Sequence, residues 1–206
     1  MECGDSSPLS IAAKPLSFPV DPEMESRFAA IQSGDESPHS KMEEFFDIVD
    51  DNDHVIGQMA RSEVHRRKLF HRAVSIFVFD SRGRLLVHQR SATKDEYPLC
   101  YTSSASGHVT AGEDYDETAP RELQEELGLT SPVERLAKFP AGPETANEFT
   151  VLYRTVTDTA PQYDPDEIAG GDFYELHEID EWLARVPEQF SPPFRIAYVW
   201  YRANSS

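Results

Sequence analysis

The stretch that decides the fold is GHVTAGEDYDETAPRELQEELGL, residues 107–129. Residues 116–127 have the composition of a helix, and Gly128 stands where a helix commonly ends. Pro120 lies inside that span, and proline is tolerated only in the first turn of a helix. We therefore expect the regular part of the helix to begin near residues 118–119.

Three carboxylates share one face of this predicted helix. Glu122, Glu125 and Glu126 stand at i, i+3 and i+4, which places their Cβ atoms about 5–6 Å apart. Like charges this close destabilise a helix unless a cation neutralises them, and Arg121 can pair with one of them. The remaining charge suits a hard divalent cation with oxygen ligands. Glu113, in the preceding loop, can reach the same face. Such clusters also occur on solvated helices without a metal.

Outward from the helix, short apolar segments separated by turn residues predict a sheet. AVSIFVFD (73–80) and LLVHQR (85–90) flank SRGR, which predicts a hairpin with Gly83 in its turn. Further strands are expected at 43–49, 55–61, 101–106, 133–140 and 149–156. Short strands mixed with helices, without strict alternation, predict an α+β fold, a mixed α/β sandwich.

Composition restricts the classes of function. The 206 residues include 37 Asp and Glu against 19 Lys and Arg, a formal net charge of −18. Such a surface repels phosphate backbones, so we expect neither a nucleic-acid partner nor an anionic membrane. The longest apolar run, 73–79, is far shorter than the ~20 residues that span a bilayer.

The N-terminus indicates a separate segment. Residues 1–40 are rich in Pro, Ser and acidic residues, which predicts a weakly ordered arm ahead of a domain at 41–206. It shows no basic region followed by an apolar stretch, and the only cysteines are Cys3 and Cys100. A reduced, cytoplasmic protein is the resulting expectation.

The stretch 107–129 fits the pattern G-x5-E-x7-R-E-U-x-E-E-x-G-U, where U is aliphatic, at all nine defined positions. It resembles the Nudix box, the motif of the Nudix hydrolases. The resemblance implies a mixed sheet flanked by helices, with the box forming a loop–helix–loop. It also implies hydrolysis of a small diphosphate linked to another moiety, with Mg²⁺ or Mn²⁺ as cofactor. Dimers are frequent in that family, which makes a homodimer a further expectation.

The resemblance implies metal-binding and positioning roles for residues of the box. The implied metal ligands are three carboxylates and one carbonyl: Glu122, Glu125, Glu126 and Gly107. Arg121 and Glu113 would orient this cluster. The resemblance leaves open whether Glu122 or a carboxylate outside the box is the general base.

Residues 45–200 show a second resemblance, to the isopentenyl-diphosphate isomerase branch of the superfamily. It is carried by LFHRAVSIFVFDSRGRLLVHQRSATKDEYP and YTSSASGHVTAGE. The branch binds metal through histidines that correspond to His65, His71 and His108, so His71 and His108 are expected to contact metal or substrate. The diphosphate-binding basic residues of the branch match Arg90 and Lys94, and NEFTVLYR supplies Glu148 as an additional acidic residue of the site.

The same residues have structural interpretations. His71 can hydrogen-bond a neighbouring backbone group, and Arg90 and Lys94 can be solvated residues near a hairpin end. Glu148 can be an edge-strand charge that opposes aggregation.

Three departures distinguish this chain from the isomerases. Ser106 stands where they carry a catalytic cysteine, and a hydroxyl is far less acidic than a thiol with its pKa of about 8.5. Their acidic pair, spaced E-x-E, is here Ala146-Asn147-Glu148. Bacterial isomerases typically have a degenerate box, whereas this one is complete. We therefore expect an isomerase-like Nudix hydrolase; the alternatives are an isomerase and a non-catalytic Nudix module that only binds its ligand.

Overall fold

The computed structural model describes residues 43–205, so the predicted arm at 1–40 lies outside the described residues. The main sheet has seven strands, with β5-β4-β3-β8-β7 in order, β6 paired to β3 and β9 paired to β4. The strands are β3 (His71–Phe79), β4 (Leu85–Arg90), β5 (Tyr101–Thr102), β6 (Ala105–His108), β7 (Glu134–Phe139), β8 (Glu148–Val156) and β9 (Ile168–Tyr174). β3 and β8 are parallel and the other neighbours are antiparallel, which makes the sheet mixed as expected.

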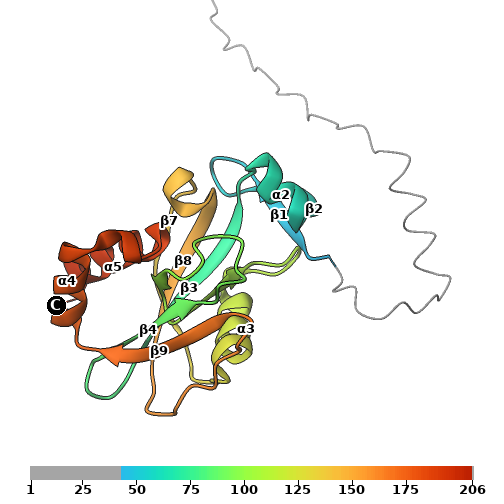
Figure 1. Cartoon of the computed structure of the whole chain (residues 1–206). Coiled ribbons are helices and arrows are strands. Elements are labelled where there is room, and N and C mark those ends of the chain that lie inside the picture. Colours follow the sequence, from blue (N-terminus) through green and yellow to red (C-terminus); the bar gives the residue numbers. More distant parts are fainter. Residues whose placement is uncertain (1–42, 206) are drawn as a thin grey trace, which may run out of the picture. The chain divides into compact units, whose positions relative to one another are not determined.

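Helices cover both faces of the sheet (Figure 1). They are α2 (Arg61–Arg67), α3 (Tyr115–Leu127), α4 (Leu176–Arg185) and α5 (Pro192–Asn204), with short 3-10 helices η1 (Pro143–Thr145) and η2 (Pro187–Gln189). Side chains alternate along β3, because successive residues of a strand point to opposite faces. Val74 and Ile76 pack in one core with Leu123 of α3, whereas Phe77 packs in a second core with Phe194 of α5. This confirms the predicted α+β class.

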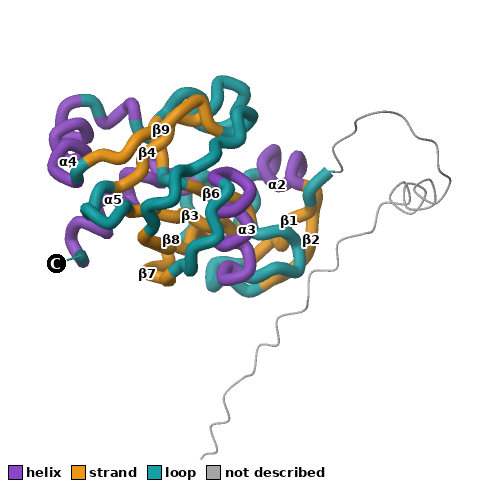
Figure 2. The backbone as a smooth tube through the Cα atoms, turned by 90° about the horizontal axis from the view of Figure 1, so that it is seen from below, coloured by secondary structure: helices purple, strands orange, loops and turns teal. Residues whose placement is uncertain are grey.

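A separate hairpin of β1 (Phe45–Val49) and β2 (Val55–Ala60) forms a two-stranded sheet. Figures 1 and 2 both place it beside α2, at the end of the domain away from α4. Phe46 of β1 nevertheless pairs with Thr110 in an isolated bridge. The hairpin therefore contacts the loop that precedes α3.

The predicted hairpin of β3 and β4 exists, but its strands pair only at its turn. Phe79 pairs with Leu85 across a turn in which Gly83 adopts a φ of 82°. Beyond that point Ser104 bridges the separating strands: its hydroxyl donates to the Leu86 carbonyl at 2.6 Å and accepts from the Val78 N–H at 2.8 Å. The separation leaves the edge of β3 free to pair with β6.

The predicted start of the central helix near residues 118–119 was wrong. α3 begins at Tyr115, because Asp114 and Glu117 form a capping box in which each side chain accepts the other's backbone N–H. Pro120 therefore lies inside the helix, where it removes one N–H from the backbone ladder. The cap supplies hydrogen bonds in the first turn and allows the helix to begin before the proline.

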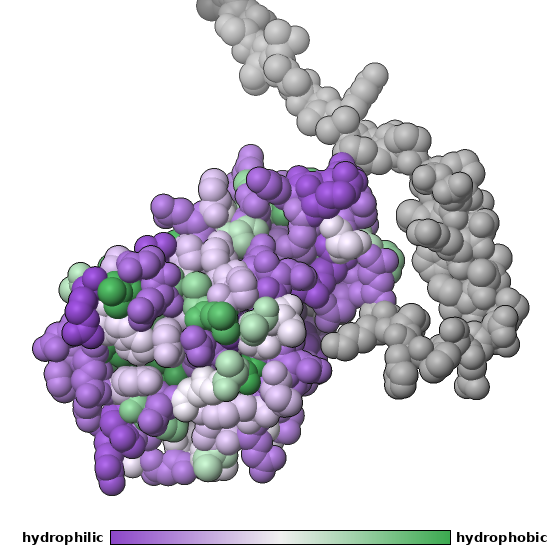
Figure 3. Space-filling view, viewed as in Figure 1, coloured by the Kyte–Doolittle hydropathy of each residue, from purple (hydrophilic) through white to green (hydrophobic). Residues whose placement is uncertain are grey.

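Hydrophilic residues cover most of the face shown in Figure 3, with hydrophobic residues between them. Among residues 43–205, no helix is both long and apolar enough to cross a membrane.

Candidate metal centre and adjoining pocket

Arg121 ties α3 to the loop that precedes it. Its guanidinium donates to three carboxylates and one carbonyl: Glu113 at 2.9 Å, Glu122 at 2.7 Å, Glu125 at 3.1 Å and the His108 oxygen at 3.3 Å. Burial by itself lowers the pKa of Arg121, but Glu113 and the other carboxylates outweigh it and raise that pKa. Arg121 thus pairs with three of the predicted carboxylates rather than one.

Glu122 and Glu126 are the buried members of the carboxylate cluster, with 9% and 7% of their surfaces exposed. Burial raises the pKa of Glu122 to about 7, since Arg121 only partly opposes it and Glu125 adds repulsion. Burial and the neighbouring Glu122 raise the pKa of Glu126 well above its usual value. Two buried carboxylates in one place favour a bound cation, because a cation offsets both their repulsion and their lost hydration.

The backbone of β6 fits closely around this pair. A Cβ atom on Gly107 would lie 2.0 Å from the Glu122 carboxyl carbon, so only glycine allows this approach. One residue earlier, the Ser106 N–H donates to Glu126 at 3.1 Å. The carboxylates are thereby held against β6, which fits the divalent-cation site predicted from the sequence.

Three histidines cluster together, and two of them contact Glu148. One ligand atom each from His65, His71 and His108 lies within 4.8 Å of the others. The Glu148 carboxylate lies 3.0 Å from His108 Nε2 and 3.6 Å from His71 Nε2. Burial alone raises the pKa of Glu148, yet its contacts with His108 and His71 lower it to about 2. The parallel register β3–β8 sets His71 opposite Glu148 as the first residue of each strand.

His71 is oriented toward this cluster by the backbone. Its Nδ1 lies 2.9 Å from the Leu69 carbonyl, so that nitrogen donates the hydrogen bond. Nε2 is buried without a hydrogen-bond partner and lies 3.6 Å from the Glu148 carboxylate. Phe46 stacks on His71 and His108, with ring centroids 5.6 and 4.6 Å away. An imidazole nitrogen without a partner, beside a carboxylate, belongs to a donor set that fits a second cation.

Of the two predicted diphosphate-binding residues, Lys94 is ion-paired and Arg90 is not, among the residues that the structure describes. Arg90 donates through Nε to the Glu96 carbonyl at 3.0 Å. Lys94 forms an ion pair with Glu167. Neither residue lines the cavity beside the histidines.

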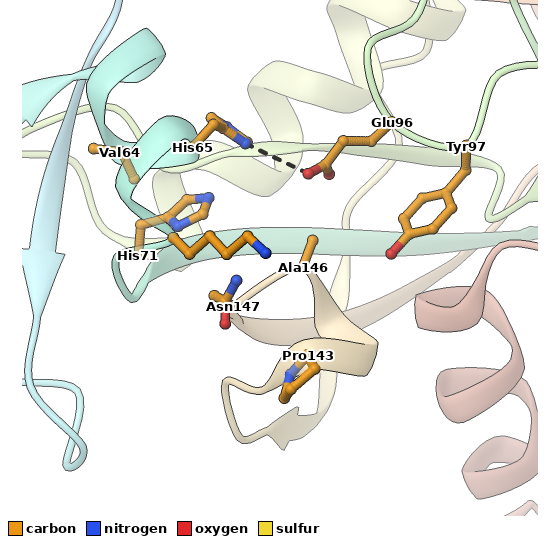
Figure 4. Close-up of a pocket in the computed structure, with 9 residues that line it drawn as sticks. Val64, His65, His71, Glu96, Tyr97, Pro143, Ala146 and Asn147 are labelled. Atoms are coloured by element: carbon orange, nitrogen blue, oxygen red, sulfur yellow. Dashed lines mark ion pairs between the residues drawn. The ribbon is translucent and has the colours of Figure 1, made fainter.

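That cavity has a volume of about 320 Å³ and lies between α2, the loop before β5 and η1 (Figure 4). Its lining includes His65, Lys68, Tyr97 and Asn147. His65 points toward Glu96, 3.5 Å away, and the Tyr97 hydroxyl points into the cavity. Sequence reasoning missed Lys68, Tyr97 and Asn147, whose φ angles of 54°, 50° and 64° are left-handed. No sequence pattern signals a lysine or tyrosine in that conformation.

The model of the NUDIX domain family matches residues 69–194. The chain belongs to the Nudix family. Its Nudix box is the Gly107–Leu129 stretch, folded as the predicted loop–helix–loop.

Curated relatives also confirm the resemblance to the isopentenyl-diphosphate isomerase branch. An isopentenyl-diphosphate Delta-isomerase of Serratia proteamaculans is 34% identical over 155 residues, 73% of this chain and 87% of that protein. An uncharacterized Nudix hydrolase of Nostoc is 33% identical over 162 residues, which cover 77% of this chain and 96% of that protein. A prenyl-diphosphate phosphatase of Methanosarcina mazei is 32% identical over 151 residues, which cover 71% of this chain and 88% of that protein.

A crystal structure from Deinococcus radiodurans has the same fold. It superimposes with a TM-score of 0.63 at 30% identity, covering 72% of this chain and 91% of that one. The Nudix fold predicted from the box is therefore confirmed.

Proposed function

We propose that this Nudix protein is a metal-dependent pyrophosphohydrolase that cleaves a small diphosphate linked to another moiety. The observation that carries the proposal is the buried Glu122–Glu126 pair, held against β6 at Gly107. The relative named as a prenyl-diphosphate phosphatase supports hydrolysis of a diphosphate.

The residues that would hold the metal come from α3 and β6. Glu122 and Glu126, with Glu125 and the Gly107 carbonyl, form an oxygen-rich donor set of the kind that Mg²⁺ or Mn²⁺ prefers. The three histidines and Glu148 form a second set of mixed nitrogen and oxygen donors. Bound divalent ions neutralise a diphosphate and lower the pKa of a coordinated water.

The protein's own groups position this reaction. Arg121 fixes the spacing of Glu113, Glu122 and Glu125, and His108 and His71 fix the Glu148 carboxylate. A water oxygen attacks one phosphorus, the bond from that phosphorus to the bridging oxygen breaks, and a monophosphate and a second phosphate product leave. The proton released by the water passes to a carboxylate. Glu125, which is exposed, and Glu148, which lies outside the box, are two candidates for this acceptor besides Glu122.

The experiment incubates the protein with Mg²⁺ and a panel of diphosphates, and identifies products by mass spectrometry. The panel holds nucleoside diphosphates and triphosphates, sugar and dinucleotide diphosphates, coenzyme A and isopentenyl diphosphate. We expect a hydrolysis product from at least one member. A panel that stays intact contradicts the proposal and favours a module that only binds its ligand.

The second candidate is an isopentenyl-diphosphate isomerase, favoured by the histidine cluster and by the relatives of that name. Ser106 is the residue against it, because a hydroxyl replaces the isomerase thiol. The isomer has the mass of its substrate, so chromatographic separation in the same experiment distinguishes the two reactions.

A further inference from the structure

The site has fewer available cations than its sequence suggests. Arg121 is paired with box glutamates and Lys94 with Glu167. Arg90 donates to a backbone carbonyl and keeps its charge, but it does not line the cavity. A diphosphate carries several negative charges, and a chain of net charge −18 repels it. A substrate of this class therefore needs a cation that the protein has not already neutralised.

Lys68 meets this requirement. It lines the cavity beside His65 and His71. Among residues 43–205, no carboxylate lies within the 4.0 Å of an ion pair with its ammonium group, whereas His65 and Lys94 each have one. A lysine ammonium is a compact charge on a flexible stem, which suits a phosphate group.

The backbone holds Lys68 in an unusual conformation. It ends α2 with a φ of 54°, its N–H donating to the His65 carbonyl at 3.1 Å, and the next N–H, of Leu69, donating to Val64 at 3.0 Å. Glycine is the residue that this helix-ending position favours. A lysine is disfavoured there by its backbone, so its side chain is the part that needs an explanation.

We propose that Lys68 binds a phosphate group of the substrate in this cavity, next to the histidine cluster. This inference rests on the proposed function, and it adds a substrate-binding residue to the predicted Arg90 and Lys94.

The first test measures binding of methylenediphosphonate, a diphosphate mimic that resists hydrolysis, by calorimetry with saturating Mg²⁺. Lys68→Met is expected to weaken binding about tenfold, because one charge-assisted contact is lost. Lys68→Arg keeps the charge and is expected to stay within about threefold of the wild type. Arg67→Met is the matched control: it removes one exposed positive charge next to Lys68 but outside the cavity.

Lys68→Gly separates binding from folding. Glycine adopts a positive φ without strain, so the melting temperature is expected to hold or rise while binding weakens as in Lys68→Met. A merely structural lysine would instead leave the binding of both variants within twofold of the wild type. That result would overturn the inference.

Kinetics on a hydrolysed panel substrate provide the second readout. In Lys68→Met we expect KM to rise about tenfold and kcat to stay within twofold. If the wild type is active and Lys68→Met leaves KM unchanged, the inference about Lys68 is wrong and the proposed function stands. If the wild type hydrolyses nothing, the proposed function fails, and the methylenediphosphonate measurement still tests Lys68.

Discussion

Gly107 is the residue at which the sheet and the carboxylates approach most closely. An added Cβ would overlap the Glu122 carboxyl group, with all three nearest atoms belonging to that side chain. The carboxylate would have to move away from β6. Because catalysis depends on placement to within about 1 Å, a small displacement carries a large penalty in rate.

Gly107→Ala is therefore expected to lower kcat by about 100-fold with little change in melting temperature. Gly170→Ala is the matched control, because an added Cβ there has no atom within 4 Å. Turnover is measured on the panel substrate and unfolding by calorimetry. Equal activity of the two variants would show that the position of Glu122 is not critical.

Glu126→Gln tests the second buried carboxylate. The amide oxygen can still accept the Ser106 N–H, but the charge that would hold a cation is lost. We expect turnover to be abolished and the circular dichroism spectrum to be unchanged. Activity that persists with the same metal dependence would remove Glu126 from the metal site.

Glu122 also predicts how stability depends on pH in the metal-free protein. Its pKa in the folded state, about 7, exceeds the usual 4.5 because of burial. The folded state therefore binds more protons between these values, and the contribution of Glu122 to stability falls as the pH rises from about 4.5 to 7.

Chemical denaturation of the metal-free wild type and Glu122→Gln at pH 5, 6, 7 and 8 measures this effect. The wild type should lose stability relative to the variant with rising pH, by at most about 3 kcal/mol, and Mg²⁺ should reduce the difference. A difference between the two proteins that is constant with pH would show that burial does not perturb Glu122.

The box residues were predictable because their chemistry is local in sequence. The pairing of Arg121 with three glutamates needed the structure, since the loop brings Glu113 back to the helix. Lys68 and Tyr97 were not predictable, because neither residue type favours the left-handed backbone that both adopt.

Among the secondary-structure elements, the separation of β3 from β4 beyond their turn has the largest effect on the site. Ser104 replaces the missing strand-to-strand hydrogen bonds there, and the freed edge of β3 receives β6. β6 in turn carries Gly107 and His108. The apolar segments on either side of SRGR predicted β3 and β4, but they carried no information on where the two strands separate.

Ser104→Ala leaves the Val78 N–H and the Leu86 carbonyl without this partner. We expect a loss of about 1–3 kcal/mol in the free energy of unfolding. Ser81→Ala, at an exposed turn position, is the control and should change stability by less than about 0.5 kcal/mol. Urea denaturation of both variants measures the difference, and equal midpoints would mean that Ser104 does not support the sheet.

The net charge of the whole protein opposes the approach of the anionic substrate proposed for the site. The chain carries a formal charge of −18, and a diphosphate approaches it against long-range repulsion. Salt screens this repulsion within a Debye length of about 10 Å at 0.1 M. Composition alone revealed this property, whereas the local cation at Lys68 emerged only from the fold.

We accordingly expect kcat/KM to rise as NaCl increases from 20 to 200 mM at saturating Mg²⁺, by about two- to fivefold. Stopped-flow or steady-state assays at constant pH measure it. A decrease over this range would mean that local positive charge, rather than net charge, dominates the approach of substrate.

The parallel pairing of β3 with β8 has a consequence for how the site comes into being. His71 and Glu148 open these two strands and meet directly, although α3 and β7 lie between them in the chain. Closing so long a loop is slow compared with forming a helix or a hairpin. During synthesis the entire Nudix box leaves the ribosome before Glu148 does. A growing chain thus carries the complete Nudix box for a time without Glu148. The site cannot be complete before β8 has been synthesised.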